Sequence, residues 1–171
     1  MTDEHEDSGR PSTSADRRAA QRAEARSRRS AARLAAVQAL YQHGQARTPV
    51  AQLLNEFHLH RLGAELEGEQ MKDADQPFFD DIVTGTLERL PELDALIAAR
   101  LATGWTMERL DRLMLHLLRA GAYELVARPD IPAAVVITEY VDVARAFYPA
   151  AESGFVNAML DGMARTTRTA G

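Results

Sequence analysis

The sequence predicts an all-α protein, a compact bundle of about seven helices in two helical subdomains. Apolar residues recur at intervals of three and four along most of the chain, which is the period of a helix with one buried face. Glycine and proline lie mainly between these segments, where they end or begin helices. No segment shows the apolar–polar alternation that is typical of a strand, and the sequence contains no internal repeat.

The composition is that of a globular protein with one ordinary core. The chain has 171 residues, of which 46% are hydrophobic, and this is enough for a single domain. Cysteine is absent, which excludes disulfides and thiolate metal sites. No apolar run approaches the roughly 20 residues that span a bilayer, and the polar, acidic N-terminus is unlike a secretory signal. We therefore expect a cytoplasmic protein without membrane contact.

The N-terminal residues differ from the rest in composition. Residues 1–14 are acidic and contain glycine, proline, serine and threonine, which predicts a disordered tail. Residues 15–171 carry the helical pattern and are expected to form a single domain. Within it, an N-terminal helical subdomain extends to about residue 90 and a C-terminal helical subdomain follows.

The first helix is the longest that the sequence predicts. Residues 17–41 contain neither glycine nor proline and are rich in alanine, the best helix former. Ser14 or Asp16 is expected as the N-cap, because a short oxygen-bearing side chain accepts from the first free N–H groups. Gly44 is expected to end the helix in a left-handed conformation.

The later helices follow from the positions of turn-forming residues. Asp75 is expected to cap the third helix with its carboxylate. Gly121 costs stability inside the fifth, so it predicts a close helix crossing. A short segment is expected near Thr106. The expected bounds of the helices are residues 48–63, 76–90, 91–104, 111–126, 132–147 and 152–165.

Positive charge is concentrated in the first helix. The formal net charge of the chain is −5, yet eight arginines between Arg10 and Arg33 stand against only Asp16 and Glu24. Charged side chains are not buried without partners, so the basic half of the helix should project from the core as an arm. Nucleic-acid binding and a solvated helix face both stay open. Five arginines at helical spacing form one stripe: Arg18, Arg22, Arg26, Arg29 and Arg33.

No catalytic or metal-binding constellation is recognisable. The sequence lacks GxGxxG, Walker, HExxH and nucleophile-elbow motifs. His58 and His60 point to different sides of a helix, and the adjacent Asp80 and Asp81 diverge in the same way. We therefore expect no catalytic residue, no metal and no cofactor, and a protein that is not an enzyme.

Four motifs lie along the predicted helices: AAVQALYQ (35–42), LLRAGAYEL (117–125), DIPAAVVITEYVDVARAF (130–147) and GFVNAMLD (154–161). Together they resemble the NusB family of transcription antitermination factors. The motifs occur in the family's order and spacing and cover about residues 25–165, although Ala158 departs from the family's FVNG pattern. The resemblance implies an all-helical, non-catalytic protein that pairs with NusE, a small ribosomal protein. Together they would bind the boxA element of ribosomal RNA leaders, a single-stranded RNA, and load an antitermination complex onto RNA polymerase.

The resemblance also implies binding residues. The family's arginine-rich motif maps onto residues 26–33, its tyrosine onto Tyr41 and its FVN motif onto residues 155–157, and the arginine stripe adds Arg22. Core packing is the alternative for the aromatic rings. The expected RNA-binding residues are Arg22, Arg26, Arg28, Arg29, Arg33, Tyr41, Phe155 and Asn157. The expected partner-binding residues on the C-terminal helices are Arg119, Tyr123 and Glu124, for which a helix-to-helix contact is the alternative.

Two other functions compete with this one. A NusB-like helical domain also precedes ribosomal-RNA cytosine methyltransferase domains, and a stand-alone copy of it would be a catalytically silent RNA-binding module. The chain could instead be a helical interaction module whose arginines face solvent, or a homodimer that covers the RNA surface.

Overall fold

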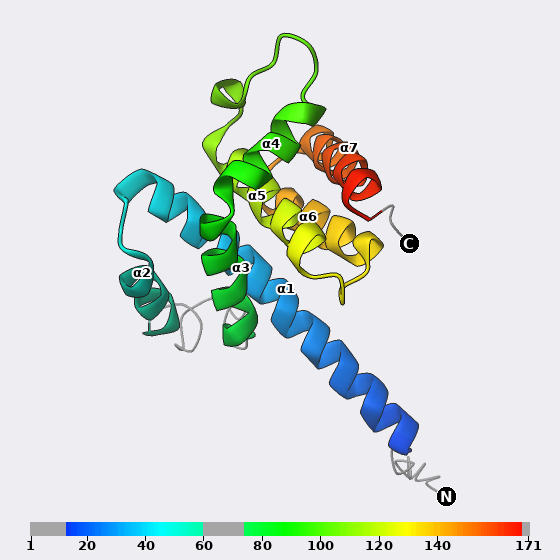
Figure 1. Cartoon of the computed structure of the whole chain (residues 1–171). Helices are drawn as coiled ribbons and strands as arrows, with labels where there is room; N and C mark the ends of the chain where they lie inside the picture. Colours follow the sequence, from blue (N-terminus) through cyan, green and yellow to red (C-terminus); the bar gives the residue numbers. More distant parts are fainter. Residues whose placement is uncertain (1–12, 60–73, 169–171) are drawn as a thin grey trace, which may run out of the picture.

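The part of the chain that the structure describes is built from helices. The computed structural model describes residues 13–59 and 74–168, and they form seven α-helices and no strand (Figure 1), which confirms the predicted fold class. The predicted tail lies almost entirely outside these residues. None of the helices in them is long and apolar enough to cross a membrane. The helices are α1 (Ser14–Ala46), α2 (Val50–Phe57), α3 (Gln76–Glu88), α4 (Leu90–Arg100), α5 (Arg112–Ala127), α6 (Ala133–Phe147) and α7 (Ala150–Thr167), with a 3₁₀ helix η2 (Met107–Arg109) before α5.

Helix α1 is half arm and half core. Residues 13–28 are exposed on every side, and this half extends away from the other helices (Figure 1). From Ala32 to Leu40 most side chains are buried, and this half packs against α3 and α5. The predicted change from basic arm to apolar root is therefore confirmed.

Two predicted ends of α1 are wrong. The N-cap is Thr13, whose hydroxyl accepts from the backbone N–H of Asp16 at 3.1 Å, while the Asp16 carboxylate accepts from the N–H of Thr13 at 3.0 Å. This reciprocal capping box satisfies two N–H groups. At the other end, the helix continues through Gly44 to Ala46, and Arg47 takes the left-handed conformation with φ 53°.

Gly44 serves packing rather than helix termination. A Cβ at this position would lie 2.6 Å from Nε2 of His116 on α5. The glycine therefore lets the end of α1 approach α5 closely. Gly121 has the predicted role, because a Cβ there would lie 2.9 Å from the side chain of Leu160 on α7.

Helix α5 lies at the centre of the bundle. Its residues from Met114 to Leu125 are almost all buried, because α1, α3, α4, α6 and α7 all pack against it. Asp111 caps it by accepting from the N–H of Met114 at 3.3 Å, and Asp75 caps α3 in the predicted way. One cluster of buried apolar residues runs through the described helices. The division into two subdomains near residue 90 stays a prediction.

Candidate nucleic-acid interface

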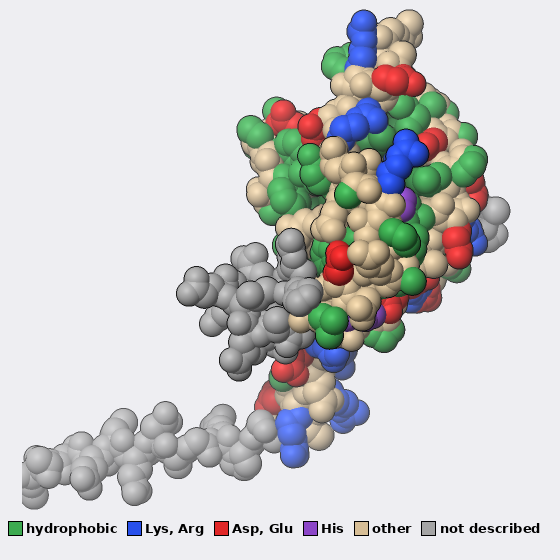
Figure 2. Space-filling model, turned by 90° about the vertical axis from the view of Figure 1, so that its left-hand side faces the viewer, with side chains coloured by type: hydrophobic (Ala, Val, Ile, Leu, Met, Phe, Trp, Pro, Cys, Tyr) green, Lys and Arg blue, Asp and Glu red, His purple; other side chains and the backbone are tan. Residues whose placement is uncertain are grey.

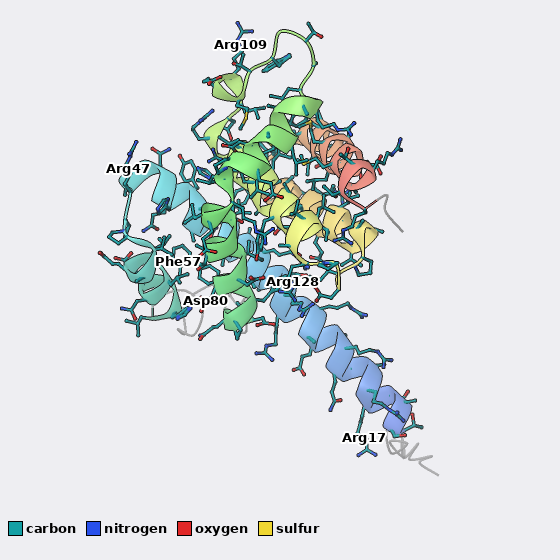
Figure 3. The ribbon with its side chains drawn as sticks, viewed as in Figure 1. Arg17, Arg47, Phe57, Asp80, Arg109 and Arg128 are labelled. Atoms are coloured by element: carbon teal, nitrogen blue, oxygen red, sulfur yellow. The ribbon has the colours of Figure 1, made fainter. Side chains whose placement is uncertain are left out.

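The arm of α1 carries arginines that face solvent. Arg22 and Arg26 are exposed, and no carboxylate among the described residues forms an ion pair with either. Arg28 is exposed as well. Arg29 is partly exposed and lies 4.0 Å from the carboxylate of Asp75, a long and weak contact. Figure 2 shows blue side chains gathered on the arm at the bottom of the view, and Figure 3 labels Arg17 near its free end.

Arg33 does not share this exposure, so its burial argues against the expected contact with RNA. Its side chain is only 3% exposed, and its guanidinium donates to both oxygens of Glu124 at 2.9 Å. Burial disfavours the guanidinium charge, but the hydrogen bonds and charge of Glu124 outweigh it, so the pKa of Arg33 is raised above its ordinary value. The stripe predicted from helical spacing therefore ends at Arg29.

A buried polar network surrounds this ion pair. The Tyr140 hydroxyl also donates to Glu124, and burial raises the pKa of Tyr140 well above its ordinary value. Glu139 lies 3.6 Å from Arg33 and accepts from the Ser30 hydroxyl at 2.7 Å. The network joins α1 to α5 and α6 at the place where the arm leaves the body.

A second feature at this place is the ring of Phe78, around which three guanidinium groups converge. Those of Arg29, Arg33 and Arg128 lie 4.8, 4.9 and 5.3 Å from its centroid, within the range of cation–π contacts. Arg128 also pairs with Asp81 at 2.9 Å and with Asp130 at 3.0 Å. Its guanidinium lowers the pKa of Asp130 below the ordinary value. These pairs neutralise Arg128, so the open basic surface belongs to the arm.

The three residues expected to bind a protein partner instead join helices. Glu124 has no exposed surface. Tyr123 is buried and donates from its hydroxyl to Asp81 on α3 at 2.6 Å, and burial together with this bond raises its pKa to about 12. Arg119 donates to both oxygens of Asp94 on α4 at 2.7 and 2.8 Å. Burial of Tyr123 and Glu124 argues against the expected partner contact, and the helix-to-helix alternative describes all three residues.

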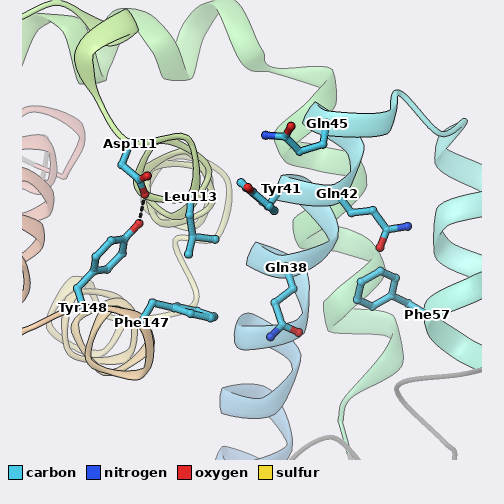
Figure 4. Close-up of a pocket in the computed structure, with 9 residues that line it drawn as sticks. All are labelled: Gln38, Tyr41, Gln42, Gln45, Phe57, Asp111, Leu113, Phe147 and Tyr148. Carbon is cyan, nitrogen blue, oxygen red and sulfur yellow. Dashed lines mark hydrogen bonds between the residues drawn. The ribbon is translucent and has the colours of Figure 1, made fainter.

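Tyr41, expected at the RNA, lines a cavity of about 700 Å³ between α1, α2, α5 and α6. The residue is 39% exposed, and its ring meets the ring of His116 edge-on. Figure 4 shows Gln38, Tyr41 and Gln45 along one side and Phe147 and Tyr148 across from them. The core-packing alternative for Tyr41 is therefore only partly correct, because much of the ring is open.

Phe155 lines a second cavity of about 490 Å³, together with Trp105. Trp105 is 56% exposed, and Phe155 is also exposed. Asp111 and Tyr148 line both cavities, and the Tyr148 hydroxyl donates to the Asp111 carboxylate (Figure 4). We call the two cavities together the aromatic groove. The sequence does not reveal this groove, because its rings come from distant segments and show no common spacing.

The aromatic groove differs from the arm in charge. Arg109 is the only cation among the residues that line it, and Asp111 and Glu152 accompany it. Figure 3 labels Arg17 and Arg109 at opposite ends of the molecule. Asn157 is exposed on α7 but lines neither cavity. The aspartates that were expected to diverge do so, because Asp80 contacts His58 and Asp81 contacts Tyr123.

His116, beneath the Tyr41 ring, makes the stability of the protein depend on pH. Burial, reinforced by the charges of Arg119 and Arg112, lowers its pKa from 6.5 to about 4, and its Nδ1 has no hydrogen-bond partner among the described residues. Below pH 6.5 the unfolded chain binds the proton more readily than the folded one. We therefore expect up to about 3 kcal/mol of stability to be lost as the pH falls from 6.5 to 4.

Urea unfolding of the wild type and of His116→Leu over this pH range measures the effect. The carboxylates titrate in both proteins, so the difference between the two curves isolates His116. Parallel curves would show that the imidazole is protonated as readily in the folded protein as in the unfolded chain.

This chain is similar to known proteins over most of its length. The NusB family model matches residues 30–165. The transcription antitermination protein NusB of Sphingopyxis alaskensis is 62% identical over 140 residues, which cover 82% of this chain and 94% of that protein. The protein of the same name from Novosphingobium aromaticivorans is 58% identical, with 82% and 95% covered.

Solved structures agree with these relatives. A T. maritima NusB structure matches with a TM-score of 0.65 at 30% identity, covering 80% of this chain and 90% of that one. The solution structure of NusB from Aquifex aeolicus matches with a TM-score of 0.62 at 24% identity, covering 84% and 93%, and supports the fold alone. The family model matches most of the chain, and the two relatives share more than half of their aligned residues with it. This chain therefore belongs to the NusB family of transcription antitermination proteins.

Proposed function

We propose that this chain binds boxA-type RNA of ribosomal RNA leaders together with NusE and helps to load an antitermination complex onto RNA polymerase. Its family makes it a transcription antitermination factor and not an enzyme. The relatives that it covers almost completely carry that name, which favours this function over the methyltransferase-related module. The observation that carries the RNA proposal is the row of exposed arginines on the projecting half of α1, of which Arg26 forms no ion pair with a carboxylate among the described residues.

The arm suits the backbone of a single-stranded RNA. Phosphate contacts from arginine position a strand and supply affinity that falls with salt. Arg26 is exposed and has no carboxylate partner among the described residues, and Arg28 and Arg29 continue this surface toward the body. Asn157 is exposed, and its amide is suited to hydrogen-bonding an unpaired base.

The aromatic groove suits a protein partner better than RNA, and we place NusE there. Tyr41 lies about 22 Å along α1 from Arg26, and its cavity contains no cation to meet a phosphate. Exposed aromatic rings in a concave apolar surface are typical anchors of protein interfaces. Tyr41 and Phe155 are therefore proposed as partner contacts. RNA stacking on their rings, or a second copy of the chain in the groove, would be the alternatives that experiment can detect.

The decisive experiment measures binding of a boxA-like RNA and of a scrambled RNA, with and without NusE. We expect the boxA-like RNA to bind more tightly and NusE to strengthen that binding. Indifference to both sequence and NusE would contradict the proposal. Light scattering of the chain alone then tells whether it forms a homodimer that NusE or RNA dissociates.

Replacing Trp105 and Phe155 with alanine is expected to weaken NusE binding at least tenfold, because the pair removes two exposed rings from one cavity. Titration calorimetry with NusE measures the loss. Val135→Ala is the control, since Val135 is also exposed but lines neither cavity. If the double variant bound NusE normally but lost RNA in the absence of NusE, the groove would be a base-stacking surface.

A further inference from the structure

The arm of α1 extends beyond the part of the chain that the family model matches. That match begins at residue 30, whereas α1 begins at Ser14. The intervening 14–29 segment is about 24 Å of helix. It carries six arginines and only two acidic residues, in a chain whose net charge is −5.

The far end of the arm has guanidinium groups to offer a ligand. Arg17, Arg18 and Arg22 are exposed, and none forms an ion pair with a carboxylate in the parts of the chain that the structure describes. Arg18 donates only to the backbone and hydroxyl oxygens of Ser14, at 3.3 and 3.4 Å, which leaves further N–H donors. Glu24, one of the two acidic residues, is exposed and makes no ion pair with these arginines.

The side chains between the arginines decide what kind of ligand fits. From Thr13 to Ser30 the remaining residues are alanine, serine, threonine, glutamine, aspartate and glutamate, without one large apolar side chain. A protein interface needs buried aromatic or aliphatic anchors, and a membrane surface helix needs an apolar face. A polyphosphate backbone needs neither, because its contacts are ionic and hydrogen-bonded.

The arm is also ordered without support from the body. Its side chains up to residue 28 are exposed, so helix propensity, the capping box at Thr13 and continuity with the packed half of α1 hold it. Arg18, Arg22 and Arg26 follow each other at four-residue intervals, about 6 Å apart along the axis. Arginines that are already held on a helix lose less conformational entropy on binding than arginines on a disordered tail.

We propose that Arg17, Arg18 and Arg22 form a second RNA contact, which binds phosphates of nucleotides flanking the boxA-type element without reading their bases. The contact rests on the proposed function and deepens it, since it adds a sequence-independent footprint to the specific one. Arg26, Arg28 and Arg29, nearer the body, serve the specific element itself.

The test compares Arg17→Ala/Arg18→Ala/Arg22→Ala with the wild-type full chain, in the presence of NusE, on two RNAs. One RNA is the boxA-like element alone, and the other carries unrelated single-stranded flanks on both sides. We expect the wild type to bind the flanked RNA more tightly and with a steeper salt dependence. In the triple variant this advantage disappears, with the slope of log K against log salt reduced by about 2, from about 0.7 per phosphate contact. Affinity for the short RNA is unchanged.

Two further variants test whether the effect depends on the position and on the charge of these arginines. Arg89→Ala/Arg145→Ala/Arg165→Ala removes the same charge from arginines that are exposed on the body, and it should keep the advantage of the flanked RNA. Lysine at positions 17, 18 and 22 should restore that advantage, since a phosphate contact needs charge. Because alanine favours helix, Arg17→Ala/Arg18→Ala/Arg22→Ala should keep the arm helical, which circular dichroism would show.

The inference is overturned if the triple variant keeps the wild-type preference for flanked RNA, or if it loses affinity for the short and flanked RNAs equally. Failure of the proposed function has a different signature. In that case the wild type itself would not distinguish the short boxA-like RNA from its scrambled form.

Discussion

Replacing Arg26 and Arg29 with alanine is expected to lower the affinity for boxA-like RNA about 25-fold at 0.1 M salt. Each phosphate contact with a single strand contributes about 0.7 to the slope of log K against log salt, so two contacts remove about 1.4, and this loss vanishes near 1 M. Arg26 is exposed without a carboxylate partner, and Arg29 has only the long contact to Asp75. Filter binding over a salt series measures the affinity and the slope together.

The control for this prediction is Arg145→Ala with Arg165→Ala. Both side chains are highly exposed, and within the described residues they pair with carboxylates on their own helices, α6 and α7. The double variant therefore removes the same charge from the body rather than from the arm. An unchanged salt slope in the arm variant would show that these two arginines do not touch phosphate. An equal loss in the control would show that net charge, rather than the arm, attracts the RNA.

Arg33→Ala is expected to destabilise the fold by about 3–5 kcal/mol, because it leaves the carboxylate of Glu124 buried without its cation. Urea unfolding measures the free energy. Glu124→Ala should cost a similar amount, since it leaves the guanidinium buried. The double variant should cost clearly less than the sum of the two, which is the signature of a direct interaction.

RNA binding separates Arg33 from its neighbours on the arm. In conditions where Arg33→Ala is still folded by circular dichroism, its salt slope for RNA should equal that of the wild type. A slope reduced as in the arm variant, with stability unchanged, would mean that the guanidinium is exposed in solution and that the buried network with Glu124 does not form.

Helical spacing predicted the arginine stripe well but could not separate its members. Arg26 and Arg33 belong to one helical stripe and both have alanines and other arginines nearby, although Arg33 is followed by the apolar residues 34–37. The burial of Arg33 depends on Glu124 and Glu139, about a hundred residues later, which reach it from α5 and α6. The rule that charged side chains remain exposed applies to unpaired charges. It does not predict which arginine will meet a carboxylate from a distant part of the chain and so be buried.

The aromatic groove marks the other limit. The rings of the groove share no spacing and lie on different elements, so no sequence motif identifies them: Tyr41, Trp105, Phe147 and Phe155. The signal that could have found the groove is exposure of large rings, which exists only after folding.

The end of α1 was predicted at the wrong residue for a similar reason. In sequence, Gly44 resembles a residue that ends a helix. In the structure it lies inside α1, where the absence of a side chain leaves room for His116.

The sequence by itself determined the helical class, the capping of α3 by Asp75, and a first helix that is basic at its start and apolar at its root. These depend on interactions within a few residues, which spacing records. The tertiary structure alone decided which arginine is buried, that Tyr123 and Glu124 join helices, and where the exposed rings converge. Each of those outcomes depends on side chains that lie far apart in the chain and meet only when α5 is enclosed by its neighbours.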